Sequence, residues 1–489
     1  MPAVIMGSFR ILSALSVMIF NSATFLLFFL VFLVAYALTS RQKRLAVCLL
    51  ASYLFYGWWD WRFLGLILLS TVVDFCVGIL LEKAKSLSSR RLLLLLSLLT
   101  NLGLLGFFKY ANFFIDSANV AMASVGVSLD SLNIILPVGI SFYTFQTLSY
   151  SIDVYRGVIP SERNFLRFAT YVAFFPQLVA GPIVRAKELL PQFHHDQNLR
   201  FDNFRIGLGL MIVGFFKKVV VADSLAPFVD LAFKDPQSLN SISMALAVVL
   251  YAFQIYCDFS GYSDIAIGIA RILGFEFPVN FRMPYFSQSF SEFWQRWHIT
   301  LSQWLRDYLY IPLGGNRGGF VSTCRNLMLT MLLGGLWHGA SWTFVVWGAL
   351  HGFYLIAQRI MGLRLARMPS LAESRIVSAC SVCIVFLLTC LAWIFFRSET
   401  FEQAFAVIQV ITFEGNWNPA SVSHKVIVGR AVLVVMLLLA GELLTIWRPR
   451  VVSAIVDSPY KSMLVYSLII SLIFLLGTFD GNQFIYFQF

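Results

Sequence analysis

Charged residues are scarce in this sequence, and long polar segments are missing from it. Asp, Glu, Lys and Arg together make up 12% of the 489 residues, whereas 59% are hydrophobic. Soluble proteins carry about 25% charged residues on average, so this composition excludes an ordinary globular protein. The lack of long polar segments also excludes a large soluble domain on either side of a membrane. The chain is therefore predicted to work in or beside a lipid bilayer.

Cysteine is also rare, and several common site motifs are missing. The seven cysteines are an odd number, and most lie inside apolar stretches, so a disulfide framework is not expected. The sequence has no zinc-protease pattern, P-loop, dinucleotide-binding fingerprint or nucleophile elbow. We therefore expect no metal site and no bound cofactor. The net charge is +11, but no long basic stripe with interleaved aromatic residues is present, which argues against a nucleic-acid partner.

Uncharged runs of membrane-spanning length are abundant. Five runs approach or exceed the roughly 20 residues that a bilayer requires: Ile11–Ser40, Leu92–Phe108, Leu327–Leu350, Ile376–Phe396 and Met463–Phe479. Short basic clusters lie in loops between apolar runs, as the positive-inside rule predicts, and Lys217 and Lys218 are interpreted as one of them. The sequence thus predicts an all-α polytopic membrane protein with roughly ten to twelve transmembrane helices.

Two segments do not fit simple spans. The stretch Ile206–Phe216 gives only about 16 Å of helix before Lys217, against a hydrocarbon core of about 30 Å. The stretch Pro278–Arg325 is rich in proline, aromatic residues and arginine but contains no lysine, which is typical of an interfacial segment. Re-entrant and interfacial helices are therefore expected beside the spans. The chain is predicted to form a single domain, residues 1–489, in which residues 1–17 are a possible N-terminal extension.

Two helical stripes of polar residues lie where polar residues are rare. The first, on a helix predicted at Met244–Ile272, consists of Tyr251, Gln254, Asp258 and Tyr262. The second follows Pro137 and consists of Tyr143, Gln146, Tyr150 and Asp153. Such residues either form hydrogen bonds between packed helices or line a polar cavity. On the second interpretation, the candidates for contact with substrate in a tunnel are Gln146, Asp153, Gln254, Asp258, Tyr262 and Trp337.

Two of the six histidines occupy informative positions. His338 lies near the midpoint of Leu327–Leu350, where an imidazole is costly without a polar partner or water and is suited to proton transfer. The glycines around it would let a substrate or another backbone approach. His298 lies at the edge of an aromatic stripe on a helical wheel, which suits a tunnel entrance or an interfacial anchor. On one continuous helix His351 would face away from His338, so these two are not expected to share a site.

Several longer motifs carry a family resemblance. These motifs follow one another in the order expected of the family and span most of residues 137–352. They are Pro137–Gln146, Asp153–Gly157, Phe175–Pro182, Asp258–Asp264, Phe293–His298, Tyr310–Gly315 and Leu336–Gly339. On these motifs the chain resembles a membrane-bound O-acyltransferase, in the branch that contains the membrane subunit of bacterial alginate O-acetylation. The resemblance implies helices around a central tunnel, with residues 137–352 as the catalytic core and His338 and His298 as catalytic residues.

The resemblance also implies a reaction. An acetyl group would pass from a cytoplasmic thioester across the bacterial inner membrane to an exported polysaccharide such as alginate. Acetyl-CoA is the expected donor, and the expected partners are membrane lipid and a periplasmic SGNH-type acetyltransferase. A neutral histidine can accept the proton of an acceptor hydroxyl. We therefore hypothesise that His338 is the general base and that His298 positions the donor or assists proton transfer.

Other interpretations stay open. Arg296 and Arg306 either hold phosphates of the donor or anchor lipid headgroups. Within the family, D-alanyl transfer to teichoic acid is the nearest alternative reaction. Outside the family, a proton-coupled secondary transporter would also use polar stripes and a buried histidine, although the sequence shows no internal repeat of the kind that many transporters have.

Overall fold

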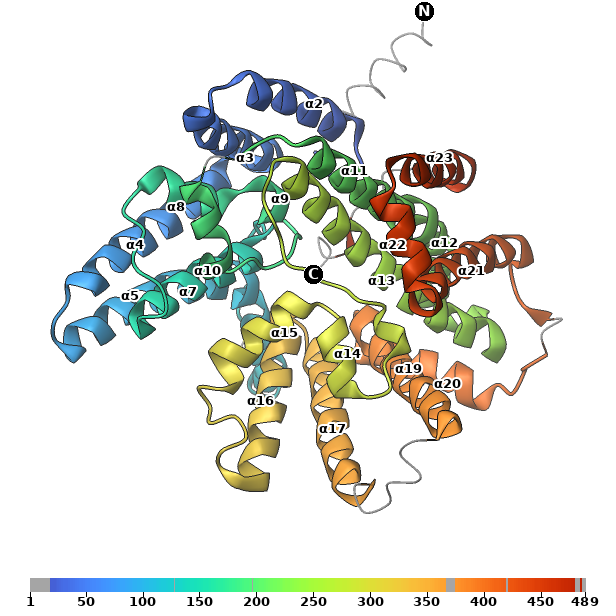
Figure 1. Ribbon diagram of the computed structural model, residues 1–489. Helices are drawn as coiled ribbons and strands as arrows, with labels where there is room; N and C mark the ends of the chain where they lie inside the picture. Colours follow the sequence, from blue (N-terminus) through green and yellow to red (C-terminus); the bar gives the residue numbers. More distant parts are fainter. Residues whose placement is uncertain are drawn as a thin grey trace, which may run out of the picture. The chain divides into compact units, whose positions relative to one another are not determined.

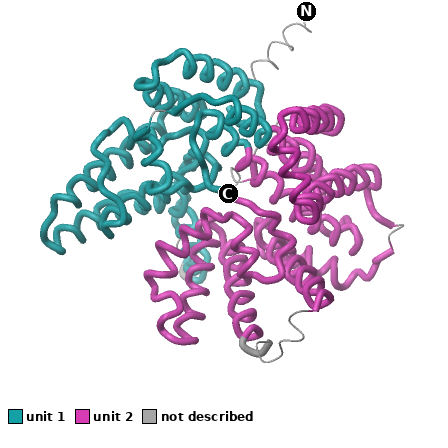
Figure 2. Tube along the Cα trace, in the orientation of Figure 1, with its two compact units in different colours: residues 1–211, 265–278 teal, residues 212–264, 279–489 magenta. Residues whose placement is uncertain are grey.

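The computed structural model describes residues 18–126, 128–195, 197–365, 374–418, 421–479 and 484–485, and these residues form helices with no strand among them (Figure 1). The predicted all-α class is therefore confirmed. The predicted extension, residues 1–17, lies outside the described residues. Two compact units divide the chain: unit 1 contains residues 1–211 and 265–278, and unit 2 contains residues 212–264 and 279–489 (Figure 2). The single-domain organisation, with its catalytic core, stays a prediction.

Unit 1 consists largely of apolar helices, several of which begin at a polar cap. Their bounds are α2 Ala23–Leu38, α3 Arg44–Asp60, α4 Leu64–Lys83, α5 Leu87–Leu105, α6 Ala111–Met122, α7 Ile140–Arg156, α8 Phe165–Ala173, α9 Phe175–Leu178 and α10 Ala186–Leu189. The hydroxyl of Ser22 accepts a hydrogen bond from the amide of Phe25 (3.1 Å) at the start of α2, and Ser86 accepts one from Ser89 (3.0 Å) at the start of α5. These caps satisfy amides that a helix leaves unpaired at its N-terminus.

A buried polar network joins α4, α5 and α7 of unit 1. The carboxylate of Asp74, on α4, accepts hydrogen bonds from Ser97 (2.5 Å) and Asn101 (2.8 Å) of α5 and from Ser151 (2.7 Å) of α7. None of the four residues is more than 1% exposed. Because a buried polar group is costly unless it is paired, this network favours one arrangement of the three helices.

Unit 2 contains most of the longer helices. Their bounds are α12 Asp223–Lys234, α14 Phe290–Arg296, α15 Ile299–Leu305, α16 Gly319–His338, α17 Trp342–Leu365, α19 Arg375–Arg397, α20 Phe401–Phe413, α21 Lys425–Trp447, α22 Pro449–Asp457 and α23 Pro459–Leu476. Two further helices, α11 (Phe201–Phe215) and α13 (Ser241–Ile272), contribute residues to both units. A π-helical segment, Phe216–Ala222, continues α11 into α12.

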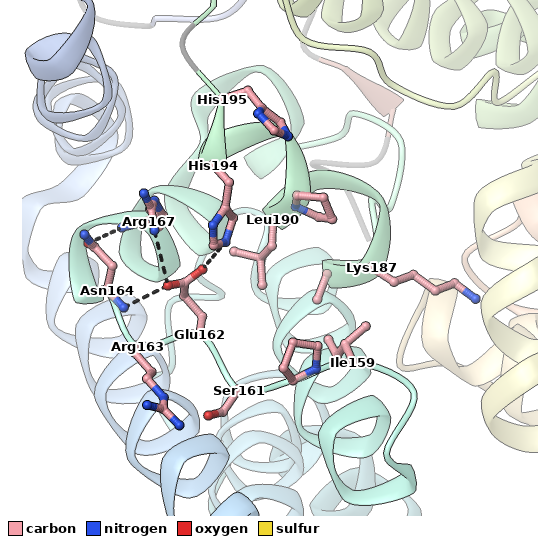
Figure 3. Close-up of a pocket in the computed structure, with 13 residues that line it drawn as sticks. Ile159, Ser161, Glu162, Arg163, Asn164, Arg167, Lys187, Leu190, His194 and His195 are labelled. Carbon is pink, nitrogen blue, oxygen red and sulfur yellow. Dashed lines mark hydrogen bonds and ion pairs between the residues drawn. The ribbon is translucent and has the colours of Figure 1, made fainter.

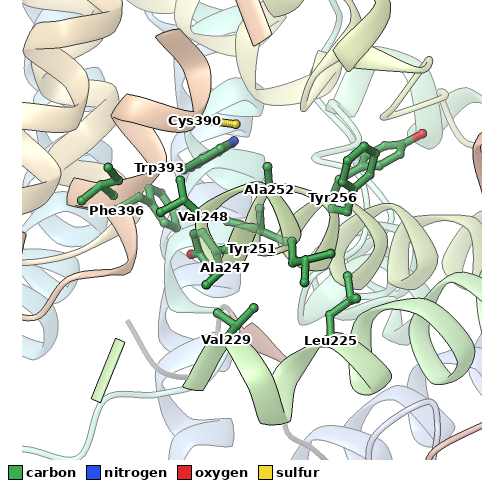
Figure 4. Packing of buried hydrophobic residues seen from close by; sticks show 14 of the residues in the cluster. Leu225, Val229, Ala247, Val248, Tyr251, Ala252, Tyr256, Cys390, Trp393 and Phe396 are labelled. Atoms are coloured by element: carbon green, nitrogen blue, oxygen red, sulfur yellow. The ribbon is translucent and has the colours of Figure 1, made fainter. Parts of the chain in front are cut away.

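The core of unit 2 is a cluster of apolar side chains from several helices. Figure 4 shows Leu225 and Val229 of α12, Val248 of α13, and Trp393 and Phe396 of α19 within this cluster. Each of the five is at most 4% exposed. In lipid, close packing rather than removal from water holds such helices together. The cluster therefore gives α13 a fixed position in the unit.

Seven helical stretches among the described residues are long and apolar enough to cross a membrane: Arg41–Lys83, Leu87–Met122, Ser241–Ile272, Trp342–Gly362, Arg375–Arg397, Lys425–Trp447 and Pro459–Leu476. The first holds both α3 and α4, and α2 and α20 are shorter apolar helices. Within the stretch Pro278–Arg325, residues 278–318 form short helices and turns, whereas residues 319–325 belong to the 20-residue helix α16, and the interfacial position of the stretch stays a prediction. The multi-pass membrane fold is confirmed, and the count of ten to twelve spans stays a prediction.

The prediction that Leu327–Leu350 forms one span is wrong. Helix α16 ends at His338 and α17 begins at Trp342. Between them Gly339 has extended backbone angles, φ −155° and ψ 148°, through which an α-helix cannot continue. The hydroxyl of Ser341 then accepts a hydrogen bond from an amide in the first turn of α17 (3.3 Å). His338 is therefore the last residue of a helix rather than the midpoint of one.

Lys217 and Lys218 are not loop charges, contrary to the prediction. Both lie in the π-helical segment that continues α11. Lys218 is 3% exposed and forms ion pairs with Asp258 of α13 (2.6 Å) and Asp223 of α12 (2.8 Å). Burial acts to lower the pKa of Lys218, but the two carboxylates outweigh burial and raise it. Because two carboxylates compensate the charge of Lys218, this lysine can lie inside a helix. The helix therefore continues past Phe216, where the sequence predicted that it would end.

Candidate functional site

His338 lies at the C-terminal end of α16, inside unit 2. The residue is 2% exposed. Unpaired carbonyl groups gather at the C-terminus of a helix and give it a partial negative charge of about half an elementary charge. An imidazolium that forms when His338 accepts a proton is therefore stabilised at this position.

The packing of α16 against α17 fixes this end of the helix. A Cβ added to Gly335 of α16 would lie 2.2 Å from the carbonyl oxygen of Phe344, and one added to Gly348 of α17 would lie 2.3 Å from the carbonyl oxygen of Met331. Only glycine permits two backbones to come so close. The prediction that glycines near His338 let another backbone approach is confirmed, and that backbone belongs to α17.

His298 connects two short helices rather than lying on one. Helix α14 ends at Arg296, and His298 adopts φ 41° and ψ 55°, a left-handed conformation that is uncommon in residues other than glycine. Its predicted position on a helical wheel is therefore wrong, and its exposure of 0% argues against an interfacial anchor. The amide of Ile299 donates to the carbonyl of Asn280 (2.9 Å), and the amide of Arg282 donates to the carbonyl of Arg296 (2.9 Å). These bonds hold the strained residue in place.

Asn280 sets the proton arrangement of His298. Its Oδ1 accepts hydrogen bonds from the amide (3.3 Å) and hydroxyl (2.9 Å) of Thr300, and its Nδ2 donates to Ser263 (3.1 Å). Because Oδ1 is the acceptor, His298 Nδ1, 3.2 Å away, is the donor. The lone pair of the neutral ring then lies on Nε2. Burial lowers the pKa of His298 to about 3, so the ring is neutral at pH 7.

The structure brings His298 and His338 together. Their ring centroids are 6.3 Å apart, and Trp337 packs against both, at 6.0 Å from His298 and 5.0 Å from His338. Trp347 (5.0 Å) and Phe396 (5.4 Å) also pack against His338. Two imidazoles inside an aromatic shell are suited to proton transfer away from bulk water. The tunnel that would lead a substrate to them stays a prediction.

The polar stripe of α13 is buried as one face, but its carboxylate has a structural partner. Its members, each at most 7% exposed, are Tyr251, Gln254, Asp258 and Tyr262. Besides its ion pair with Lys218, Asp258 accepts a hydrogen bond from the amide of Ile485 (2.8 Å). Gln254 Oε1 is buried and has no hydrogen-bond partner in the described part of the chain. The contact of these residues with substrate stays a prediction, and it is better supported for Gln254 than for Asp258.

The second polar stripe lies on α7 of unit 1. Its members, each at most 3% exposed, are Tyr143, Gln146, Tyr150 and Asp153. Neither polar side-chain atom of Gln146 has a hydrogen-bond partner among the described residues, whereas the hydroxyl of Tyr150 accepts a hydrogen bond from the amide of Glu162 (3.0 Å). The stripe is thus buried as predicted. Gln146 and Asp153 stay candidates for contact with substrate.

Arg296 and Arg306 are already paired with nearby carboxylates. Arg296 Nη2 lies 2.6 Å from Glu292, and Arg306 Nε lies 2.7 Å from Asp307. The side chain of Arg306 is 58% exposed and that of Arg296 is 33% exposed. A donor phosphate would have to compete with these carboxylates, so the structure gives the donor-binding prediction no direct support, and it stays a prediction.

Asn280, Phe259 and Trp347 are neighbours of the histidines that the sequence did not reveal. Phe259 of α13 packs edge-on against His298 at 4.6 Å. Trp347 contacts both His338 (5.0 Å) and His351 (4.8 Å). The predicted separation of these two histidines assumed one continuous helix, and the helix break invalidates that assumption. No spacing rule links Asn280 to His298, since they meet through non-helical segments.

Known proteins match the sequence over much of its length. The model of the membrane-bound O-acyltransferase family matches residues 158–401. A protein of Azotobacter vinelandii named probable alginate O-acetylase AlgI is 47% identical over 82% of this chain and 79% of the relative. The peptidoglycan O-acetyltransferase of Helicobacter pylori is 38% identical over 80% of this chain and 79% of the relative. The teichoic acid D-alanyltransferase of Streptococcus thermophilus is 29% identical over 45% of this chain and 55% of the relative.

The matched segment contains the features on which the site depends. The family model covers His298, His338 and the helices α14, α15 and α16 beside them. The two relatives named for O-acetylation match the chain over most of both sequences, and the described residues include seven helical stretches that are long and apolar enough to cross a membrane. The chain therefore belongs to the membrane-bound O-acyltransferase family.

Proposed function

We propose that this acyltransferase moves an acetyl group from a cytoplasmic thioester across the bacterial inner membrane for O-acetylation of an exported polysaccharide, and that the polysaccharide is alginate. The observation that carries the proposal is the pair of buried imidazoles of His298 and His338, 6.3 Å apart. The choice of alginate follows from the 47% identical relative. D-alanyl transfer is less favoured, because the two relatives with that name are only 29% and 24% identical, over 45% and 55% of the chain.

The chemistry needs a base and a positioned thioester. We take acetyl-CoA as the donor, because a thioester is already activated toward an oxygen nucleophile. His338 accepts the proton of the acceptor hydroxyl, whose oxygen forms a bond to the acetyl carbonyl carbon. The carbon–sulfur bond then breaks, and the proton passes from the imidazolium to the departing thiolate. His298 is neutral and presents the Nε2 lone pair, so it positions the donor or assists this return of the proton.

The acceptor and the partner complete the proposal. A periplasmic SGNH-type acetyltransferase would finish the transfer to the polysaccharide, and membrane lipid surrounds the spans. The similarity to a peptidoglycan O-acetyltransferase makes peptidoglycan the second candidate acceptor. Acetate released by mild alkali from purified alginate and from purified peptidoglycan of the same cells separates the two acceptors. We expect the acetate in alginate.

The central test is acetylation in cells that carry His338→Ala. General base catalysis contributes about 100-fold or more, so polymer-bound acetate should fall to background while the amount of protein in the membrane is unchanged. His424→Asn is the matched control, because His424 is exposed and its backbone, at φ 54°, suits asparagine. Wild-type acetate content in the His338→Ala strain would remove the catalytic assignment.

A further inference from the structure

Unit 1 contains a cavity whose lining includes neither of the two histidines of the proposed mechanism. Its volume is about 660 Å³, which is within the range of small-molecule sites. Figure 3 shows its lining, which comes from the segment before α8, from α8, from α10 and from the turn after α10. Among its walls are the apolar side chains of Ile159, Pro160 and Leu190.

The lining carries more positive than negative charge. Its cations are Arg163, Arg167 and Lys187, its histidines are His194 and His195, and Glu162 is its single carboxylate. Glu162 is satisfied inside the protein: it lies 2.8 Å from His194 Nε2 and 3.9 Å from Arg167, and it accepts a hydrogen bond from the amide of Asn164 (2.8 Å). Figure 3 shows these groups converging on the Glu162 carboxylate.

Arg163 and Lys187, the other two cationic side chains of the lining, are compensated less strongly by carboxylates than Arg167 is. Arg163 contacts Glu82 of α4 at 3.4 Å, with its own side chain 80% exposed, so this pair is weakened by solvent. Lys187 is exposed and has no hydrogen-bond or ion-pair partner in the described part of the chain. His195 is exposed as well. The mouth of the cavity therefore attracts an anion.

The cavity lies at one end of α4. Ser161 donates a hydrogen bond to Glu82, next to Lys83 at the end of that helix, and Arg90 of α5 donates to the carbonyl of Tyr155 (2.6 Å). The positive-inside rule places this basic turn between α4 and α5 on the cytoplasmic side. Phosphate groups reach that side from two sources: the headgroups of anionic phospholipids and soluble phosphate-bearing molecules.

We propose that this cavity binds the phosphate group of a ligand at the cytoplasmic face. Guanidinium and ammonium groups donate hydrogen bonds to phosphate oxygens, and the apolar walls accept the non-polar body of the ligand. One source is an anionic phospholipid. The other is the phosphate-bearing part of a coenzyme A thioester, and only this second source rests on the proposed function.

Binding to the full-length protein in maltoside detergent tests the proposal with two probes, coenzyme A and dihexanoyl phosphatidylglycerol. The double variant Arg167→Gln, Lys187→Gln should bind one probe at least about tenfold more weakly than wild type. Lys187→Gln alone, at an exposed position that folding does not need, should weaken the same probe. Lys461→Gln removes an exposed lysine of unit 2 and should leave both affinities unchanged.

A substitution of opposite sign sharpens the test. Glu162→Gln removes the carboxylate that competes for Arg167 and His194, so it should tighten phosphate binding by about three- to tenfold. Weakening of coenzyme A in the double variant assigns the cavity to the donor, and weakening of the lipid assigns it to a headgroup. If wild type binds neither probe, or if both affinities survive in the double variant, the proposal is overturned. Because the readout is binding, it stands or falls independently of acetyl transfer.

Discussion

At the scale of single residues, Asn280 fixes the orientation of the His298 ring. Asn280→Asp keeps an acceptor for the Nδ1 proton, which lies 3.2 Å away in the wild type, and adds a negative charge. Such a charge favours the imidazolium and raises a histidine pKa by about 1–3 units, from the value of about 3 that burial produces. Because the proposed role needs the neutral ring, the acid limb of acetyl transfer in proteoliposomes should move to higher pH by about the same amount.

Asn280→Ala is the control for this prediction. It removes the acceptor without adding charge, so the imidazole loses its fixed orientation while burial still keeps its pKa low. Loss of the orienting partner of a metal-bound histidine costs about 10- to 100-fold; for the metal-free His298 we expect a lower rate with no upward move of the acid limb. If the acid limb shifts equally in both variants, or in neither, the assigned hydrogen bond does not govern the ring.

The sequence revealed the two histidines but not the groups that hold them. An imidazole stands out in an uncharged run because its burial is costly, and the same argument identified Asp258. The partners did not stand out. The sequence predicts a loop position for Lys218, because a lysine usually marks the end of an apolar segment. Only tertiary packing brings Asp258 to it (2.6 Å). Asn280 contacts His298 because backbone hydrogen bonds pair the two loops that carry these residues. The spacing of residues along the sequence does not predict such a contact.

At the scale of helices, the α16–α17 pair carries His338. Gly335→Ala would place a Cβ 2.2 Å from the carbonyl oxygen of Phe344, so the two helices must move apart. Overpacking of this kind costs about 1–3 kcal/mol. We expect the purified protein to unfold at a lower temperature and, since the end of α16 shifts, to lose acetyl transfer. Thermal unfolding in detergent, followed by tryptophan fluorescence, measures the first effect.

Gly362→Ala, on the same α17, is the matched control. Nothing lies within 4 Å of its added Cβ, and alanine favours a helix over glycine by up to about 1 kcal/mol. This variant should therefore unfold at the wild-type temperature or slightly above it. Equal unfolding temperatures for the two alanine variants would contradict the close packing of α16 against α17.

The ends of a helix could be predicted from the sequence where charged residues flank an apolar run. Helix α19 extends the predicted run Ile376–Phe396 by one arginine at each end, because those arginines mark where the apolar segment stops. The prediction of one helix for the run Leu327–Leu350 was wrong, because hydropathy does not distinguish one long helix from two helices joined by small residues. Gly339 is a signal for the end of a helix and Ser341 a signal for the start of the next. These two residues, rather than the uniform hydropathy of the run, determine where the helices begin and end.

At the scale of the whole molecule, α4 determines which loops face opposite sides of the membrane. Its 20 residues give about 30 Å of helix, the thickness of the hydrocarbon core. Beyond its C-terminal end lie Lys85, Arg90 and Arg91, whereas at its other end Arg62 is paired with Asp60 (2.5 Å). The uncompensated basic end should lie in the cytoplasm.

Single cysteines at the two ends test this orientation. In spheroplasts, a membrane-impermeant maleimide should label Arg62→Cys directly but should label Lys85→Cys only after permeabilisation, with the wild-type protein and its seven native cysteines as background. Labelling of Lys85→Cys in intact spheroplasts would reverse the topology. Because Arg163 of the unit 1 cavity contacts Glu82, at this same end of α4, a reversed topology would also exclude cytoplasmic coenzyme A as its ligand. The expected labelling would place the cavity where a soluble donor and inner-leaflet headgroups both reach it.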